Sequence, residues 1–231
     1  VTDAAGNSPS DLTIAVTVTD VNDQTPTYTS SDTTPNIAEQ TTAVETLTVT
    51  DTDTGDVNAC TLGGADASSF SCTVNGDSVS LAFSSAPDFE NPGSVDSDND
   101  YSVTVTISDG VNTGATISYT VTVDDANDFT PTYSAGDLTP SVAEGSTAVD
   151  SFTVSDADTD DVNACIRGGA DAALFTCTVS GDDITLAFAS APDYDSASDA
   201  NSDNDYIVTV AISDGTNTGS TLSYTVSVTD L

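Results

Sequence analysis

DVNACTLGGADASSFSCTVNGDSVSLAFSSAPDFE, residues 56–90, returns as DVNACIRGGADAALFTCTVSGDDITLAFASAPDYD, residues 161–195. The repeat continues outward in both directions without a gap, because Pro26 recurs as Pro131 and Tyr101 as Tyr206, each 105 residues later. Self-similarity at a fixed period indicates a duplicated structural unit. The chain of 231 residues therefore holds two copies of one module.

The first residues of the chain match the end of a module and not its beginning. LTIAVTVTDVND, residues 12–23, resembles ATISYTVTVDDAND, residues 115–128, and LSYTVSVTDL, residues 222–231. We expect residues 1–22 to be the C-terminal hairpin of a preceding module, and residues 23–127 and 128–231 to be the two modules. The parent protein is expected to contain more copies, or this unit to join end to end with itself.

The hydrophobic pattern predicts strands throughout. YSVTVTIS, residues 101–108, and ISYTVTV, residues 117–123, alternate apolar positions with Thr or Ser at period two. Short segments of this kind are separated by Gly, Asn, Asp and Pro at regular spacing. The pattern predicts an all-β fold made of tandem immunoglobulin-like Greek-key β-sandwiches.

The charge balance excludes two classes of partner. The chain has 38 Asp and Glu against one Lys or Arg and no His, for a formal net charge of −37. Nucleic acid and anionic membrane surfaces are bound through basic side chains, and only Arg167 is available. No apolar stretch approaches the ~20 residues of a spanning helix. We therefore expect no nucleic-acid partner and no membrane insertion.

The four cysteines form two equally spaced pairs. Cys60 and Cys72, like Cys165 and Cys177, flank a short loop that we expect between neighbouring strands. The spacing is not a metal or redox Cys-x-x-Cys signature, so two disulfides are predicted. Disulfides place the chain in an oxidising compartment, outside the cell or at its surface.

The acidic residues cluster in four recurring patterns at the predicted ends of strands. The first is DVNDQTP and DANDFTP, the second DTDTGDVN and DADTDDVN, and the third PDFE and PDYD. The fourth is an early Glu together with a late SDG. In order along the chain the candidate metal ligands are Asp20, Asn22, Asp23, Glu39, Asp51, Asp53, Asn58, Asp88, Glu90, Asp109, Asp125, Asn127, Asp128, Glu144, Asp156, Asp158, Asn163, Asp193, Asp195, Asp214 and Asp230.

Clustered carboxylates repel one another unless a hard cation lies among them. Calcium accepts about six to eight oxygens from carboxylates, Asn amides and backbone carbonyls. Alternate residues of an extended segment project to the same side, which suits the Asp-x-Asp and Asp-x-Asn spacings. Transition metals prefer the imidazole or free thiolate that this chain lacks. The predicted cofactor is calcium, and the plain alternative is a solvated, solubilising acidic surface.

These motifs, in this order, resemble the cadherin repeat over essentially the whole chain. The resemblance implies that calcium is held at the junction between successive modules. It assigns Glu39, Asp88, Glu90, Asp125, Asn127, Asp128, Asp156, Asp158, Asn163 and Asp214 to the complete junction. It assigns Asp20, Asn22, Asp23, Asp51, Asp53, Asn58 and Asp109 to the junction before it, and Glu144, Asp193, Asp195 and Asp230 to the one after it.

The chain departs from the cadherin pattern in several places. Asp195 replaces an expected Glu, and the cysteine loop and the loops VDSDND and DANSDND are additional. These features point to a microbial cadherin-like branch. The loop acids Asp96, Asp98 and Asp100 are turn residues or ligands of an extra ion. No Trp is present, so the Trp-anchored homophilic adhesion of animal cadherins is not implied.

Three classes of function follow. The first is a structural or adhesive extracellular protein, a calcium-stiffened rod or a subunit of a head-to-tail fibre or filament whose partners are adjacent copies. The second is a carbohydrate- or protein-binding module of a large adhesin. The third is an enzyme, with Asp88 and Glu90 as a glycosidase pair, which their place in a repeated motif argues against. No Asn-x-Ser/Thr sequon occurs, whereas exposed Ser and Thr could carry O-linked glycans.

Overall fold

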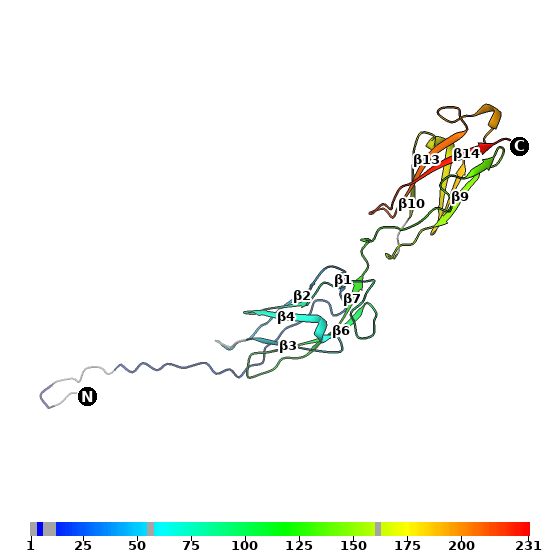
Figure 1. Ribbon diagram of the computed structural model, residues 1–231. Helices are drawn as coiled ribbons and strands as arrows, with labels where there is room; N and C mark the ends of the chain where they lie inside the picture. Colours follow the sequence, from blue (N-terminus) through cyan, green and yellow to red (C-terminus); the bar gives the residue numbers. More distant parts are fainter. Residues whose placement is uncertain (1–3, 7–12, 55–57, 160–162) are drawn as a thin grey trace. The chain divides into compact units, whose positions relative to one another are not determined.

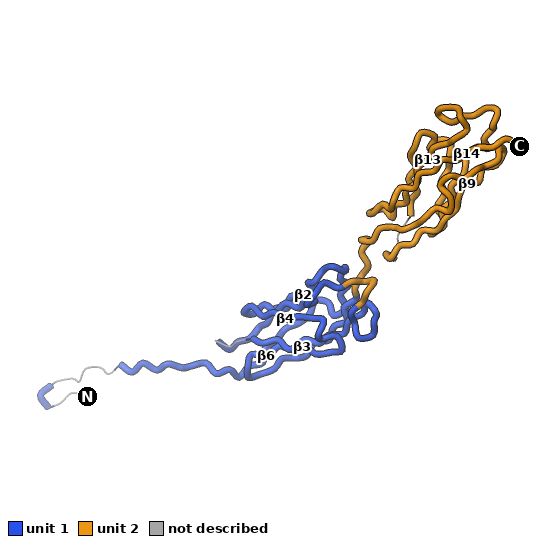
Figure 2. Tube along the Cα trace, viewed as in Figure 1, with its two compact units in different colours: residues 1–87, 93–122 blue, residues 88–92, 123–231 orange. Residues whose placement is uncertain are grey.

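The computed structural model describes residues 4–6, 13–54, 58–159 and 163–231. It divides into two compact units, residues 1–87 with 93–122 and residues 88–92 with 123–231 (Figure 2). Each unit holds one β-sandwich, which confirms the all-β prediction. The expected boundaries at residues 23 and 128 stay a prediction. None of the helices in the described residues is long and apolar enough to cross a membrane.

The first sandwich has seven strands in two sheets (Figure 1). One sheet has the order β1-β7-β6-β3 and the other β2-β5-β4. Their bounds are β1 Asn36–Ala38, β2 Ala43–Thr48, β3 Ala59–Gly63, β4 Phe70–Asn75, β5 Ser78–Phe83, β6 Asp100–Ser108 and β7 Ile117–Asp124, with a 3-10 turn, η1, at Ala67–Ser69.

The second sandwich repeats this topology, with sheets β10-β13-β14-β8 and β11-β12-β9. Its strands are β8 Ser141–Ala143, β9 Ala148–Thr153, β10 Ala164–Gly168, β11 Phe175–Ser180, β12 Asp183–Phe188, β13 Asp205–Ser213 and β14 Leu222–Thr229. Two 3-10 turns, η2 at Ala172–Leu174 and η3 at Tyr194–Ser196, complete it. β14 pairs antiparallel with β13 and parallel with β8, so it is a central strand of its sheet.

Alternation along the strands explains why the two sheets stack. On β6, Tyr101, Val103, Val105 and Ile107 are buried while the residues between them are more exposed. Phe70 and Phe83 stack with ring centroids 4.5 Å apart, and Tyr101 meets Phe83 edge-on. Each fully buried aromatic or aliphatic side chain contributes roughly 1.5–3 kcal/mol. Phe175, Phe188 and Tyr206 repeat the cluster in the second sandwich.

Both predicted disulfides are present, Cys60–Cys72 and Cys165–Cys177. The sequence analysis expected the loop between each pair to lie between neighbouring strands. The two strands that it joins are consecutive in the chain but belong to different sheets. Cys60 lies on β3 of the four-stranded sheet and Cys72 on β4 of the three-stranded sheet. The chain crosses between the sheets here because η1 turns it, so each disulfide ties the two layers of a sandwich together.

Two buried carboxylates that the sequence analysis did not single out anchor the additional loops. Asp66 is buried, and its two oxygens accept hydrogen bonds from the amides of Val95 and Ser102, each at 2.7 Å. Asp171 accepts from Ala200 and Ile207 at the same distances. Both oxygens of each carboxylate are therefore used to hold a loop against the sandwich.

A tyrosine and a carboxylate join the sheets in each module. The Tyr119 hydroxyl on β7 donates to Glu45 on β2, and Tyr224 on β14 donates to Asp150 on β9. Burial raises the pKa of Glu45, but hydrogen bonds from Tyr119, Ser30 and Ser31 outweigh it and hold this pKa below the ordinary value. Burial, reinforced by Glu45, raises the pKa of Tyr119.

Removing the disulfide of one module tests its contribution. Replacing Cys165 and Cys177 by Ala should lower the free energy of unfolding of the second module by about 2–3 kcal/mol, because the bridge no longer restricts the unfolded chain. Urea unfolding followed by hydrogen exchange reports each module separately. The first module is the internal control, and an unchanged second module would contradict the expectation.

The Tyr119–Glu45 hydrogen bond should be visible in the pH dependence of stability. Tyr119→Phe is expected to lower the free energy of unfolding at pH 7 by about 1–2 kcal/mol. The folded-state pKa of Glu45 lies below its ordinary value of 4.5. The difference in free energy of unfolding between the parent and the variant is therefore complete above pH 4.5. It should shrink as the pH falls through the folded-state pKa. A difference that is constant from pH 7 to pH 3, measured in chelator, would contradict this.

Candidate metal centre

The ends of two strands bring three aspartates together in the second unit. Asp156 and Asp158 follow β9, and Asp214 follows β13 directly. Each offers one carboxylate oxygen, and these oxygens lie within 4.8 Å of one another. Asp158 and Asp214 are only 8% and 5% exposed. Three carboxylates at this spacing, largely shielded from water, are strongly repulsive in the absence of a cation.

A second group shares Asp158 with the first. Oxygens of Glu90, Asp125 and Asp158 also lie within 4.8 Å of one another, and all three residues belong to the second unit. Asp158 therefore connects the two groups. Glu90, Asp125, Asp156, Asp158 and Asp214, which the sequence assigned to one junction, form a continuous acidic cluster, here named the Asp158 cluster.

Hydrogen bonds orient the carboxylates of the Asp158 cluster. Thr159 donates its backbone amide and its hydroxyl to Oδ2 of Asp125, both at 2.5 Å. The amide of Phe129 donates to Oδ2 of Asp158 at 2.9 Å. Oδ1 of Asp214 accepts from the amides of Thr216 and Asn217 at 2.7 and 2.6 Å. In each case the hydrogen bonds fix one carboxylate oxygen and thereby the rotamer of the aspartate side chain.

The other oxygens are buried and accept no hydrogen bond. This is true of Asp125 Oδ1, Asp156 Oδ2, Asp158 Oδ1, Asp214 Oδ2 and the amide oxygen Asn163 Oδ1. A buried polar atom without a partner costs roughly 1–3 kcal/mol, and more when it is charged. Such oxygens require a cation or bound water. Their all-oxygen chemistry fits calcium.

Burial and hydrogen bonds shift the pKa values of the Asp158 cluster in opposite directions. Burial raises the pKa of Asp156, and the charges of Asp158 and Asp214 add to this. Burial also raises the pKa of Asp125 and of Asp214. Hydrogen bonds outweigh it, chiefly those from Thr159 to Asp125 and from Asn217 to Asp214, and bring both pKa values below the ordinary value. The chain's single basic side chain, Arg167, donates to the carbonyls of Ala172 and Phe175 within the disulfide loop. It does not neutralise the cluster.

The linker before each module is held by an asparagine pair. Asn217 Nδ2 donates to Asn127 Oδ1 at 3.1 Å, and Asn127 Nδ2 donates to the Asp214 carbonyl at 3.5 Å. Asn112 and Asn22 repeat the pair in the first module at 2.8 Å. Asn112 and Asn217 were not among the predicted site residues. Their signal was the repeated Asn-Thr-Gly after each SDG.

The first module carries a sparser version of the cluster. Asp20 Oδ2 accepts from Thr54, and Asp53 Oδ2 accepts from the amides of Asp23 and Gln24. Asp51 Oδ2 and Asn58 Oδ1 are buried without a hydrogen-bond partner. No group of three close acids among the described residues includes Asp20, Asp51, Asp53 or Asp109. The predicted ligands of this end are thus held in the same way but less closely gathered.

The remaining predicted ligands are not members of the Asp158 cluster, and Asp128 among them lies in the linker. Glu144 accepts hydrogen bonds from the amides of Tyr194 at 2.9 Å and Leu231 at 3.4 Å. Glu39 is buried, and Asp88 accepts from the amide of Asn91 at 3.0 Å. Asp128, Asp193, Asp195 and Asp230 are exposed. No close group of three acids in the described part of the chain includes Glu144, Asp193, Asp195 or Asp230.

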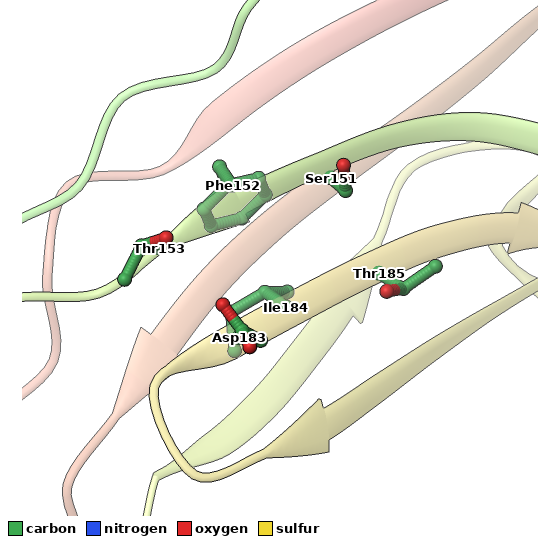
Figure 3. A pocket seen from close by; sticks show the side chains of 6 residues that line it. All are labelled: Ser151, Phe152, Thr153, Asp183, Ile184 and Thr185. Atoms are coloured by element: carbon green, nitrogen blue, oxygen red, sulfur yellow. The ribbon is translucent and has the colours of Figure 1, made fainter.

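One hollow of the second sandwich has no acidic cluster among the described residues that line it. It has a volume of about 280 Å³, lies between β9 and β12 and is lined by Ser151, Phe152, Thr153, Asp183, Ile184 and Thr185 (Figure 3). It contains none of the predicted ligands. Its one aromatic side chain, Phe152, is only 8% exposed and belongs to the core. The hollow therefore presents no ring on which a sugar could stack.

Comparison with known proteins gives structural matches alone. No protein-family model matches the chain, and no curated protein does. The solved structures that match include the extracellular domain of protocadherin gamma B4, 22% identical, covering 93% of this chain and 34% of its own length with a TM-score of 0.60. The fold is that of cadherin ectodomains.

Two further structures with the cadherin fold lead to the same result. The cis-dimer structure of domains 3–6 of protocadherin gamma B7 is 20% identical over 87% of this chain and 46% of its own, with a TM-score of 0.58. The human desmocollin-1 ectodomain is 16% identical over 100% of this chain and 46% of its own, with a TM-score of 0.55. This chain spans less than half the length of these three structures.

Removing the shared ligand tests the cluster. Asp158→Asn keeps an acceptor for the Phe129 amide but removes a charge common to both groups, so calcium affinity of the tightest site should fall at least tenfold. Isothermal titration and terbium luminescence measure it. Asp137→Asn is the control, because Asp137 is an exposed turn residue of the same module. Equal affinity in both variants would contradict the site.

Proposed function

We propose that this chain is part of an extracellular structural or adhesive protein in which calcium binds at the Asp158 cluster and stiffens a row of cadherin-like modules. The observation that carries the proposal is the set of four buried carboxylate oxygens without hydrogen-bond partners in the Asp158 cluster, on Asp125, Asp156, Asp158 and Asp214. Backbone amides hold the opposite oxygens, so the ligands are oriented before any ion binds. This is the arrangement expected of a built cation site.

Calcium is the ion that the donor set favours. The candidate ligands are carboxylates and amide oxygens, all four Cys are in disulfides and His is absent. The residues that would hold the ion are Glu90, Asp125, Asp156, Asp158, Asn163 and Asp214, joined by Glu39, Asp88, Asn127 and Asp128 as the cadherin resemblance implies. Bound calcium would supply positive charge to carboxylates that otherwise repel one another.

The mechanical role follows from where the ligands stand in the sequence. Glu90 and Asp125 precede the second sandwich, whereas Asp156, Asp158 and Asp214 belong to its loops. An ion that binds both sets restricts the linker relative to the sandwich. Two further sets of ligands would serve junctions with neighbouring modules. They are Asp20, Asn22, Asp23, Asp51, Asp53, Asn58 and Asp109 before the first module, and Glu144, Asp193, Asp195 and Asp230 after the second.

Adjacent copies are the partners we propose. The repeated acidic ends and the net charge of −37 favour contacts bridged by calcium between similar modules, in a rod or a head-to-tail fibre at the cell surface. Residues 1–22 would then close a preceding module. The added disulfide loops and the loops VDSDND and DANSDND favour a microbial branch. A sugar-binding or enzymatic role has no comparable support, since the hollow between β9 and β12 holds one carboxylate and no exposed ring.

Chelation should loosen the linker before it unfolds the modules. A ligand that prefers the aligned state stabilises it by ~2.7 kcal/mol at a hundredfold excess over Kd, and each sandwich retains its own core and disulfide without it. Small-angle scattering should show a shorter mean length in excess chelator than in millimolar calcium. Hydrogen exchange should show β6 and β13 still protected.

Asp128→Ala should reproduce the effect of chelation at this junction, with Asp137→Ala as the control. The same extended length with calcium and with chelator would overturn calcium-dependent stiffening. A permanently rigid rod would then be the better account.

A further inference from the structure

Residues 13–19, TIAVTVT, have the sequence of a last strand. Counting forward by the repeat of 105 residues, Ile14 corresponds to Tyr119 on β7, Val16 to Val121 and Val18 to Val123. The intervening residues 13, 15, 17 and 19 are Thr or Ala, where β7 has Ser118, Thr120 and Thr122 on its more exposed face. The apolar residues of this segment, here named the N-terminal segment, are thus spaced to fill one face of a sandwich.

The environment of the N-terminal segment differs sharply from that of β7 and β14. Ile14, Val16 and Val18 are 73%, 80% and 90% exposed, whereas Tyr119, Val121 and Val123 are at most 2% exposed. No strand is assigned to residues 13–19. Both sandwiches in the described residues already contain their own last strand, β7 and β14. The segment therefore fits a sandwich other than these two.

The last-strand position makes a specific chemical demand. In the second module Tyr224 is fully buried and its hydroxyl donates to Asp150 Oδ2 at 2.8 Å. In the first, Tyr119 donates to Glu45. Ile14 has no hydroxyl. A sandwich that carried Asp or Glu at this position of its second strand would bury that carboxylate against the Ile14 side chain with one hydrogen bond fewer.

We propose that the N-terminal segment is the central last strand of a third cadherin-like sandwich, one whose second strand carries an apolar side chain where Glu45 and Asp150 stand. The proposal rests on the assignment of residues 1–22 to a preceding module. It adds a property of that preceding sandwich: at the second-strand position facing Ile14 it differs from both described modules. A second copy of this chain does not fit, because both of its last-strand positions face a carboxylate.

A strand exchange within the full chain tests the fit. In the chimera, residues 222–228, LSYTVSV, are replaced by the sequence of residues 12–18, LTIAVTV. With Asp150 present the second module should melt several degrees below the parent. Adding Asp150→Leu should restore most of that loss, whereas Asp150→Leu in the parent should lower its melting temperature, because Tyr224 loses its acceptor. The first module serves as the internal standard.

Each outcome decides the proposal. The proposal is supported if Asp150→Leu raises the melting temperature of the second module in the chimera but not in the parent. If the chimera fails to fold both with Asp150 and with Asp150→Leu, the N-terminal segment is not a last strand. If the two chimeras have the same melting temperature, the segment does not select its partner. Calcium titration of the parent chain is independent of these results, so the proposed function can fail separately. A calcium-loaded dimer of the parent in which residues 13–19 become protected from hydrogen exchange would assign the strand to a second copy and overturn the proposal.

Discussion

Backbone amides bind one oxygen of each key carboxylate at the start of the second sandwich and leave the other oxygen buried and without a donor. Asp158 is the central case, because the Phe129 amide donates to Oδ2 while Oδ1 is buried without a hydrogen-bond partner and the residue belongs to both groups of acids. The arrangement cannot relax by solvation, since Asp158 and Asp214 are almost inaccessible to water. A cation is the simplest way to satisfy it, and the proposed function depends on this constraint.

The sandwich supplies the rigidity that the cluster needs. Strands β9 and β13 lie in different sheets, and the acids at their ends are close because the sheets are stacked. The core around Phe175, Phe188 and Tyr206 and the disulfide Cys165–Cys177 hold the two sheets together. The same parts recur in the first sandwich, so duplication copied the scaffold and the ligand positions together.

Tyrosine–carboxylate pairs give each last strand an identity beyond its apolar pattern. The hydrophobic alternation of residues 13–19, β7 and β14 is nearly the same, yet two of these segments carry Tyr opposite an acid and one carries Ile. Apolar burial is non-directional and accepts any strand of suitable shape. A buried hydroxyl and its acceptor are directional, so they restrict which side chain the last strand can carry at this position.

The sequence by itself determined the duplication, the all-β sandwich and the pairing of the cysteines, because repeats, period-two alternation and spacing are local properties of the chain. It also picked out the acids of the Asp158 cluster. Only the tertiary structure decided that each disulfide joins two sheets, that Asp66 and Asp171 anchor loops, and that Asn217 holds Asn127. The carboxylate and asparagine contacts join residues 29 to 90 apart in the sequence, and even the disulfides, 12 residues apart, join strands whose sheets are set by tertiary stacking. It also decided which oxygen of each carboxylate is satisfied, since that requires the position of every neighbouring amide.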